Sequence, residues 1–135
     1  MADGKIHYRG RAKQLRDFSG LRFGNITPTD IDGIIEYKNK AYIIIEGKKG
    51  EAPFLGGQKL ALDRLSDDVR TAGKQTLLIL YHHNVDDCTK DVNVAEQSVS
   101  SYKLNGKWNQ PQFGQTVRQL CDQFIFGLEE VFRNG

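Results

Sequence analysis

The chain has 135 residues, of which 39% are hydrophobic and 27% are charged, and its net charge is +2. These values exclude an intrinsically disordered chain and are typical of a single globular domain over residues 1–135. The longest clean apolar run, residues 77–81, is far too short to cross a bilayer, and no apolar run follows Met1. We therefore expect a cytoplasmic protein without a membrane partner, in which Cys88 and Cys121 stay reduced.

The positive charge is concentrated near the N-terminus, where residues 1–25 hold six cations and two anions. Such a segment can bind the phosphates of a nucleic acid, although a solvated helix face explains the same pattern equally well. The candidate phosphate-binding residues of this segment are Arg9, Arg11, Lys13 and Arg16.

The first predicted elements are a short amphipathic helix at residues 8–18 and a strand at 21–26. Residues 31–37 and 41–47 are predicted to form a β-hairpin, because both runs are rich in isoleucine and tyrosine. Apolar side chains fall on both faces of these two runs. The sheet should therefore be covered on both sides, as in α/β proteins.

The second half of the chain begins with apolar residues at helical spacing between Leu62 and Ala72, with Gly73 as the C-cap. Residues 75–81 are predicted to form a buried strand parallel to the second hairpin strand, because a helix connects the two. Residues 92–104 fit no single element, and Asn105–Gly106 predicts a β-turn or small hairpin. The final segment predicts a helix with an apolar face of Val117, Leu120, Cys121, Phe124, Leu128, Val131 and Phe132.

The simplest packing of these elements is one mixed sheet flanked by helices, which is an α/β fold. If residues 38–40 form the hairpin turn, Tyr37 pairs with Ala41 and Asp32 lies opposite Glu46. Directly opposed side chains share a face, with Cβ atoms roughly 5 Å apart. Two carboxylates that close repel each other unless a cation lies between them, and Mg²⁺ prefers such oxygen ligands. The sequence therefore predicts a metal site at Asp32 and Glu46; the alternative is that both are solvated charges at strand ends.

The aspartate, the isoleucine-rich hairpin and the Glu-x-Lys of residues 46–48 resemble the PD-(D/E)XK nuclease superfamily over about residues 8–82. That superfamily includes restriction enzymes, Holliday-junction resolvases and phage exonucleases. The resemblance implies a restriction-endonuclease-like mixed sheet with an αβββαβ core, here followed by a further strand and helix. Asp32 matches the first aspartate of the motif, and Asp30 competes for that role because Thr29–Asp30 stands in place of Pro-Asp. Residues 8–18 lack the glutamate that some branches carry in the first helix.

The resemblance also implies roles for these residues. Asp32 and Glu46 bind Mg²⁺, for which Mn²⁺ can substitute, and the Gly47 carbonyl is a third ligand. Lys48 orients or activates the attacking water and offsets negative charge. Gln58 holds that water or Lys48, unless it is only a polar residue at a helix start. Lys49 lies on the other face of its strand, where it contacts phosphate or is solvated.

The implied function is that of a Mg²⁺-dependent deoxyribonuclease, an enzyme that hydrolyses the phosphodiester bonds of DNA. Two alternatives are a non-catalytic nucleic-acid-binding or interaction module with the same fold, and a subunit of a larger nuclease assembly. A zinc site in the segment from His82 to Cys88 is a weaker hypothesis, because its spacing matches no zinc motif.

A homodimer is also predicted. Phe113 and Phe126 lie off the apolar face of the last helix, which indicates a second apolar contact. A duplex cut on both strands needs two sites, and two-fold symmetry would supply them.

Overall fold

The computed structural model describes residues 17–54 and 56–134, excluding the side chains of residues 132 and 134. This part of the chain forms a mixed α/β structure with one five-stranded sheet and two α-helices. The strands are β1 (Gly33–Tyr37), β2 (Ala41–Lys49), β3 (Gln75–His83), β4 (Val99–Leu104) and β5 (Lys107–Asn109). The helices are α2 (Gly56–Thr71) and α3 (Val117–Asn134), with short 3-10 turns η1 (Ser19–Leu21) and η2 (Val94–Glu96).

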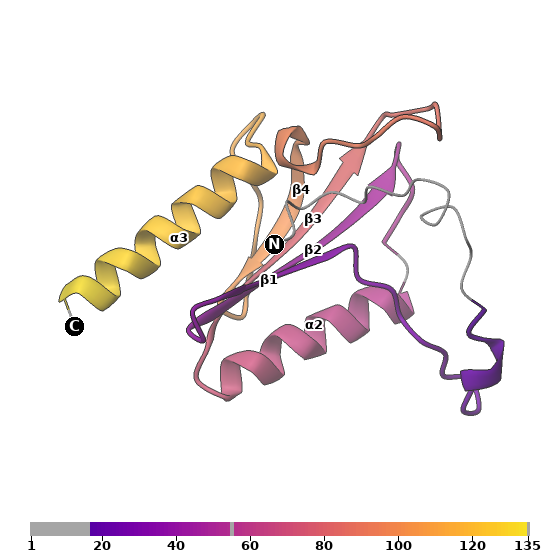
Figure 1. Ribbon diagram of the computed structural model, residues 1–135, viewed down its shortest axis with the longest axis horizontal. Helices are drawn as coiled ribbons and strands as arrows, with labels where there is room; N and C mark the ends of the chain where they lie inside the picture. Colours follow the sequence, from indigo (N-terminus) through magenta and orange to yellow (C-terminus); the bar gives the residue numbers. More distant parts are fainter. Residues whose placement is uncertain (1–16, 55, 135) are drawn as a thin grey trace.

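The sheet has the strand order β1-β2-β3-β4-β5. The pair β2 and β3 is parallel and is connected through α2, whereas the other neighbouring pairs are antiparallel. The predicted parallel pairing is therefore confirmed. Figure 1 shows α2 and α3 on opposite sides of the sheet, so the predicted arrangement of helices on both faces is also confirmed.

The hairpin of β1 and β2 has the predicted register, in which Tyr37 pairs with Ala41 and Gly33 pairs with Ile45. The turn contains Lys38 and Asn39, whose φ angles are 52° and 58°, and the Lys40 amide donates to the Tyr37 carbonyl at 2.8 Å. Continuing this register by one residue places Asp32 opposite Glu46.

The sheet separates two apolar clusters. On the α2 side, Ile44, Leu62, Leu78 and Leu80 are buried together. The larger cluster lies on the α3 side and contains Val117, Leu120, Phe124 and Leu128 of α3 packed on Ala41, Ile43, Leu77, Ile79, Tyr81 and Val99. This confirms most of the predicted apolar face of the last helix, but Val131 is exposed.

The expectation that both faces of the hairpin are covered is wrong for β1. Ile34 and Ile35 point to opposite faces of this strand and both are exposed. The reason is position in the sheet: β1 is an edge strand, and the two helices pack mainly over β2, β3 and β4.

The predicted strand at residues 21–26 is also wrong. Gly24 has a φ of +63°, and the chain turns back so that the main chains of Phe23 and Ile26 bond to each other, at 2.9 and 3.0 Å. Within the described residues, two strands rather than three therefore precede α2. Residues 8–16 of the predicted first helix lie outside the described part, and Phe18 is not helical.

The Asn105–Gly106 turn joins β4 to β5, as predicted, and both residues have a positive φ. Nearby, Lys103 of β4 is buried against α2 and forms ion pairs with Asp63 at 2.5 Å and Asp67 at 2.7 Å. Burial opposes the charge of Lys103, but the two carboxylate hydrogen bonds outweigh burial and raise the pKa of the ammonium. These ion pairs attach α2 to strand β4.

Phe113 and Phe126 are exposed, at 108% and 67%, as a second apolar contact requires. The homodimer itself stays a prediction. No helix in the described residues is long and apolar enough to cross a membrane.

Leu78 offers a test of the α2-side cluster, because it is 0% exposed whereas Leu60, on α2, is 46% exposed. We expect Leu78→Ala to lower the free energy of unfolding by about 3 kcal/mol, through lost burial and the cavity left behind. The matched Leu60→Ala should change it by less than about 0.5 kcal/mol. Urea unfolding followed by circular dichroism measures both, and equal effects would contradict the described packing.

Candidate functional site

The carboxylate of Glu46 is buried near the end of β2, where the residue is only 3% exposed. Glu46 lies two residues beyond Ile44 in β2 and so shares its face of the sheet, the α2 face. Its Oε1 accepts a hydrogen bond from Gln58 Nε2 at 2.9 Å, and its Oε2 accepts one from the Asp32 amide at 3.1 Å. Burying a carboxylate without such partners would cost several kcal/mol.

Asp32 lies one residue before β1 and is bonded to β2 in return. Its Oδ2 accepts a hydrogen bond from the Gly47 amide at 2.8 Å. The amide of each segment thus serves the carboxylate of the other, which fixes Asp32 beside Glu46. The sequence predicted that these two residues face each other, and the observed register brings them together.

Gln58, in the first turn of α2, links Glu46 to the segment before β1. Besides Glu46, its Nε2 donates to the Asp30 main-chain carbonyl at 3.3 Å. Asp30 thus contributes a backbone oxygen here, whereas Asp32 contributes its carboxylate. Of the two competing aspartates, Asp32 has the geometry expected of the site residue.

The charges of this cluster are not balanced. Burial, and then the negative charge of Asp32, raise the pKa of Glu46; the hydrogen bonds from Asp32 and Gln58 and the charge of Lys48 oppose this shift only in part. Burial and the charges of Asp32 and Glu46 also raise the pKa of Tyr81 to about 12. A cation held between the carboxylates of Asp32 and Glu46 would reduce the repulsion between their negative charges.

Lys48 and Lys49 have different surroundings. Lys48 is half-buried two residues beyond Glu46 and shares its face, as the alternation of the strand predicts. Lys49 is exposed and forms a surface ion pair with Asp86 at 3.3 Å. Only Lys48 therefore belongs to the carboxylate cluster.

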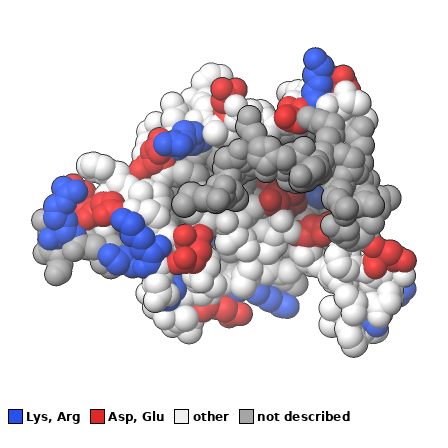
Figure 2. Space-filling view, viewed as in Figure 1, with Lys and Arg blue, Asp and Glu red and all other residues white. Residues whose placement is uncertain are grey.

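The predicted phosphate-binding residues Arg9, Arg11, Lys13 and Arg16 lie outside the described residues. In Figure 2 the described Lys and Arg side chains lie at separate places among Asp and Glu side chains. On this view, the described atoms do not form one continuous basic surface.

His82 anchors the loop before α2, a role that no pattern in the sequence indicates. Its Nε2 lies 2.8 Å from the Ala52 carbonyl, and its Nδ1 lies 2.6 Å from Ser100 Oγ. Because a carbonyl can only accept, Nε2 carries a proton, and both ring nitrogens are occupied. The ring also packs edge-on against Phe54, at a centroid distance of 5.1 Å. His82 is therefore engaged in holding the loop and does not support the zinc hypothesis.

The described residues contain no group of three or more His, Cys, Asp or Glu side chains that could hold a metal ion. The predicted ligand set is not such a group of three side chains, because it combines the two carboxylates of Asp32 and Glu46 with the main-chain carbonyl of Gly47. Its oxygen donors match the preference of Mg²⁺, and the raised pKa of Glu46 marks uncompensated negative charge at this point. The residues present therefore fit a hard divalent cation.

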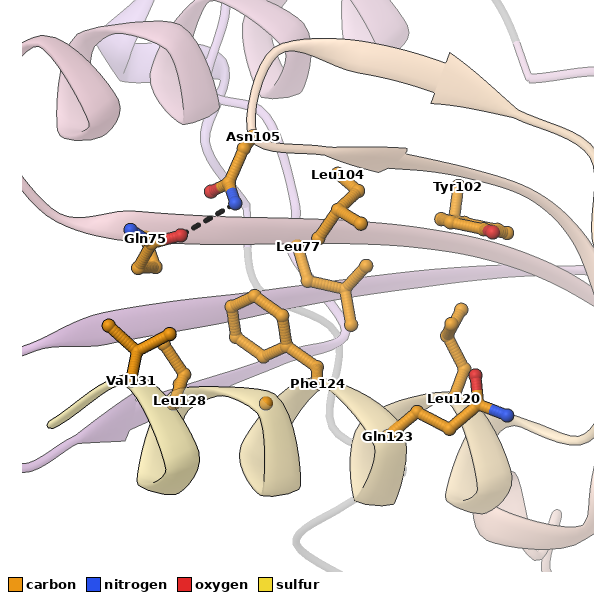
Figure 3. Close-up of a pocket in the computed structure, with 11 residues that line it drawn as sticks. Gln75, Leu77, Tyr102, Leu104, Asn105, Leu120, Gln123, Phe124, Leu128 and Val131 are labelled. Carbon is orange, nitrogen blue, oxygen red and sulfur yellow. Dashed lines mark hydrogen bonds between the residues drawn. The ribbon is translucent and has the colours of Figure 1, made fainter. Parts of the chain in front are cut away.

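A separate apolar pocket of about 280 Å³ lies on the other side of the sheet, between α3 and the strands β3 and β4 (Figure 3). Leu77, Leu104 and Phe124 line its interior, and Gln75 and Asn105 are bonded to each other at 2.6 Å at one end. It shares no residue with the carboxylate cluster.

Comparison of the chain with protein-family models, curated proteins and solved structures gave no match. The chemistry of the site must therefore support any functional inference.

The raised pKa of Glu46 predicts a dependence of stability on pH. Because the folded-state pKa lies above the ordinary value of 4.5, ionising Glu46 destabilises the fold as pH rises from 4.5, and the loss is complete above the raised pKa. Asp32→Asn removes one cause of the shift and keeps an oxygen for the Gly47 amide. In EDTA, we expect Asp32→Asn to melt above the wild type at neutral pH, with the gain shrinking toward pH 4.

Thermal unfolding of both proteins between about pH 4 and pH 8 measures this difference. A variant that melts below the wild type at neutral pH in EDTA would show that the Asp32 charge stabilises the fold.

Proposed function

We propose that this chain is a metal-dependent nuclease that hydrolyses the phosphodiester bonds of DNA, with a PD-(D/E)XK active site. The observation that supports this most directly is the bonding of Asp32 to both Glu46 and Gly47, which holds the two carboxylates together, with Lys48 on the face of Glu46. A binding module has no use for paired carboxylates that repel DNA and destabilise their own fold. A hydrolase needs them to hold a cation.

A restriction-endonuclease-like fold is part of the proposal. The order of hairpin, helix and parallel strand, with a helix on each face of the sheet, supports it. The third strand of the superfamily's meander is missing from the described residues, which leaves β1 at the sheet edge.

The proposed roles follow from where each group lies. Asp32, Glu46 and the Gly47 carbonyl would hold Mg²⁺ or Mn²⁺, which when bound supplies Lewis acidity to the phosphate and lowers the pKa of its water. Lys48 orients the attacking water and offsets the negative charge that develops on the phosphate. Gln58 is bonded to Glu46 and Asp30, so we assign it the positioning of the Glu46 carboxylate, not contact with the water.

A subunit of a larger nuclease assembly is the second candidate. One observation favours it: four large apolar side chains are exposed in the segment before β1, namely Phe18, Leu21, Phe23 and Ile26. In Figure 1 this segment extends away from the sheet. Exposed apolar groups gathered on one segment are typical of a surface that contacts another chain.

The metal ligands are tested by cleavage of plasmid and single-stranded DNA in Mg²⁺, with EDTA as the control. We expect Asp32→Asn and Glu46→Gln each to lower turnover by about 10²-fold or more, because each removes a ligand charge. Asp30→Asn is the matched control and should remain active, since Asp30 contributes its main-chain carbonyl. An inactive Asp30 variant beside an active Asp32 variant would reverse the assignment. Wild-type protein inactive on linear, nicked, branched and single-stranded DNA would favour the assembly subunit.

Adjacent lysines test the proposed role of Lys48. Lys48→Ala should lower kcat by about 10²-fold, the scale of losing a charge-stabilising group. Lys49→Ala removes a cation outside the cluster and should act mainly on KM. Steady-state kinetics on one DNA substrate separate the two parameters, and equal losses of kcat would contradict the difference between the two lysines.

A further inference from the structure

Gly47 is a glycine because of space, not because of its backbone conformation. It lies within the regular ladder between β2 and β3, where it pairs with Tyr81. A Cβ atom added at Gly47 would lie 2.5 Å from both Cε2 and the hydroxyl oxygen of Tyr81, and closer still to Cζ. The end of the Tyr81 ring therefore occupies the space that any side chain at position 47 would need.

The Tyr81 ring cannot easily move aside. It is 4% exposed and belongs to the cluster on the α3 side, together with Val99 and Phe124. Interiors of this kind are closely packed, so moving an aromatic ring displaces several neighbours. Tyr81 thus limits how far the main chain of β2 can shift toward the α3 side.

The position of Gly47 matters for the carboxylates on the opposite face of β2. Its amide donates to Asp32 Oδ2 at 2.8 Å, and the Asp32 amide donates to Glu46 Oε2 at 3.1 Å. A displaced Gly47 would lengthen its hydrogen bond to Asp32, and a shift of Asp32 would then alter the hydrogen bond from Asp32 to Glu46.

We propose that Tyr81 is a positioning residue whose ring fixes Gly47 from the α3 side of the sheet and thereby aims the Gly47 amide at Asp32. The consequence for catalysis rests on the proposed nuclease function, whereas the consequence for the Gly47–Asp32 hydrogen bond does not.

The catalytic consequence is tested with four proteins: the wild type, Gly47→Ala, Tyr81→Leu and the double variant. Gly47→Ala should lower kcat by about 10²-fold, since a small displacement of a reacting group has effects of this size. In the Tyr81→Leu background, where the end of the ring is gone, the same Gly47→Ala change should cost less than about threefold. Independent effects of the two substitutions would overturn the proposal.

Amide hydrogen exchange tests the positioning role without any activity. We expect Tyr81→Leu to lower the protection of the Gly47 amide more than that of the core Ile43 and Ile44 amides of the same strand. Tyr81→Phe keeps the ring and should retain the protection. Equal loss at all three amides would show that Tyr81 supports only global stability, and would overturn the proposal. If Gly47 responds as expected but the wild type cleaves no DNA, the nuclease function fails and the positioning role stands.

Discussion

The burial of the Glu46 carboxylate is the constraint on which the rest of the site depends. An ionised carboxylate removed from water is stable only when its oxygens are bonded and its charge is offset. Gln58 and the Asp32 amide provide the hydrogen bonds, but the neighbouring charge with the largest effect on the pKa of Glu46 is that of Asp32, which has the same sign. The site therefore satisfies the hydrogen-bonding requirement of Glu46 more fully than its charge requirement.

Three parts of the fold must each place one group correctly for this arrangement to form. The register of β1 on β2 brings Asp32 to Glu46, the start of α2 brings Gln58, and β3 holds the main chain of β2 from the other side. Each contact comes from a different element, and a slip of one residue in the hairpin would move Asp32 to the other face. The tight turn sets this register, because Lys38 and Asn39 adopt the positive φ angles that such a turn requires and the Lys40 amide bonds to the Tyr37 carbonyl.

Much of this was predictable because it depends on local patterns. Isoleucine-rich strands around a short turn predicted the hairpin register, and therefore the proximity of Asp32 and Glu46. Residues 21–26 were predicted wrongly because strand propensity ignores what a strand pairs with, and Gly24 allows the chain to turn back on itself. The contact of Tyr81 with Gly47 could not be predicted, because it depends on the register of a parallel pair joined through a whole helix.

The two faces of β2 contribute different things to the site, polar side chains on one and packing on the other. On the α2 face are Glu46 and Lys48, the polar groups whose chemistry the proposed function needs. On the α3 face, at the residue between them, a buried aromatic ring takes the place of a side chain. A glycine in a strand ordinarily weakens it, through lost packing and greater chain entropy. Here the ring restores the packing that Gly47 lacks, so the strand stays rigid at the point where its amide must hold Asp32. Rigidity there matters because two like charges held close together will separate unless the main chain prevents it.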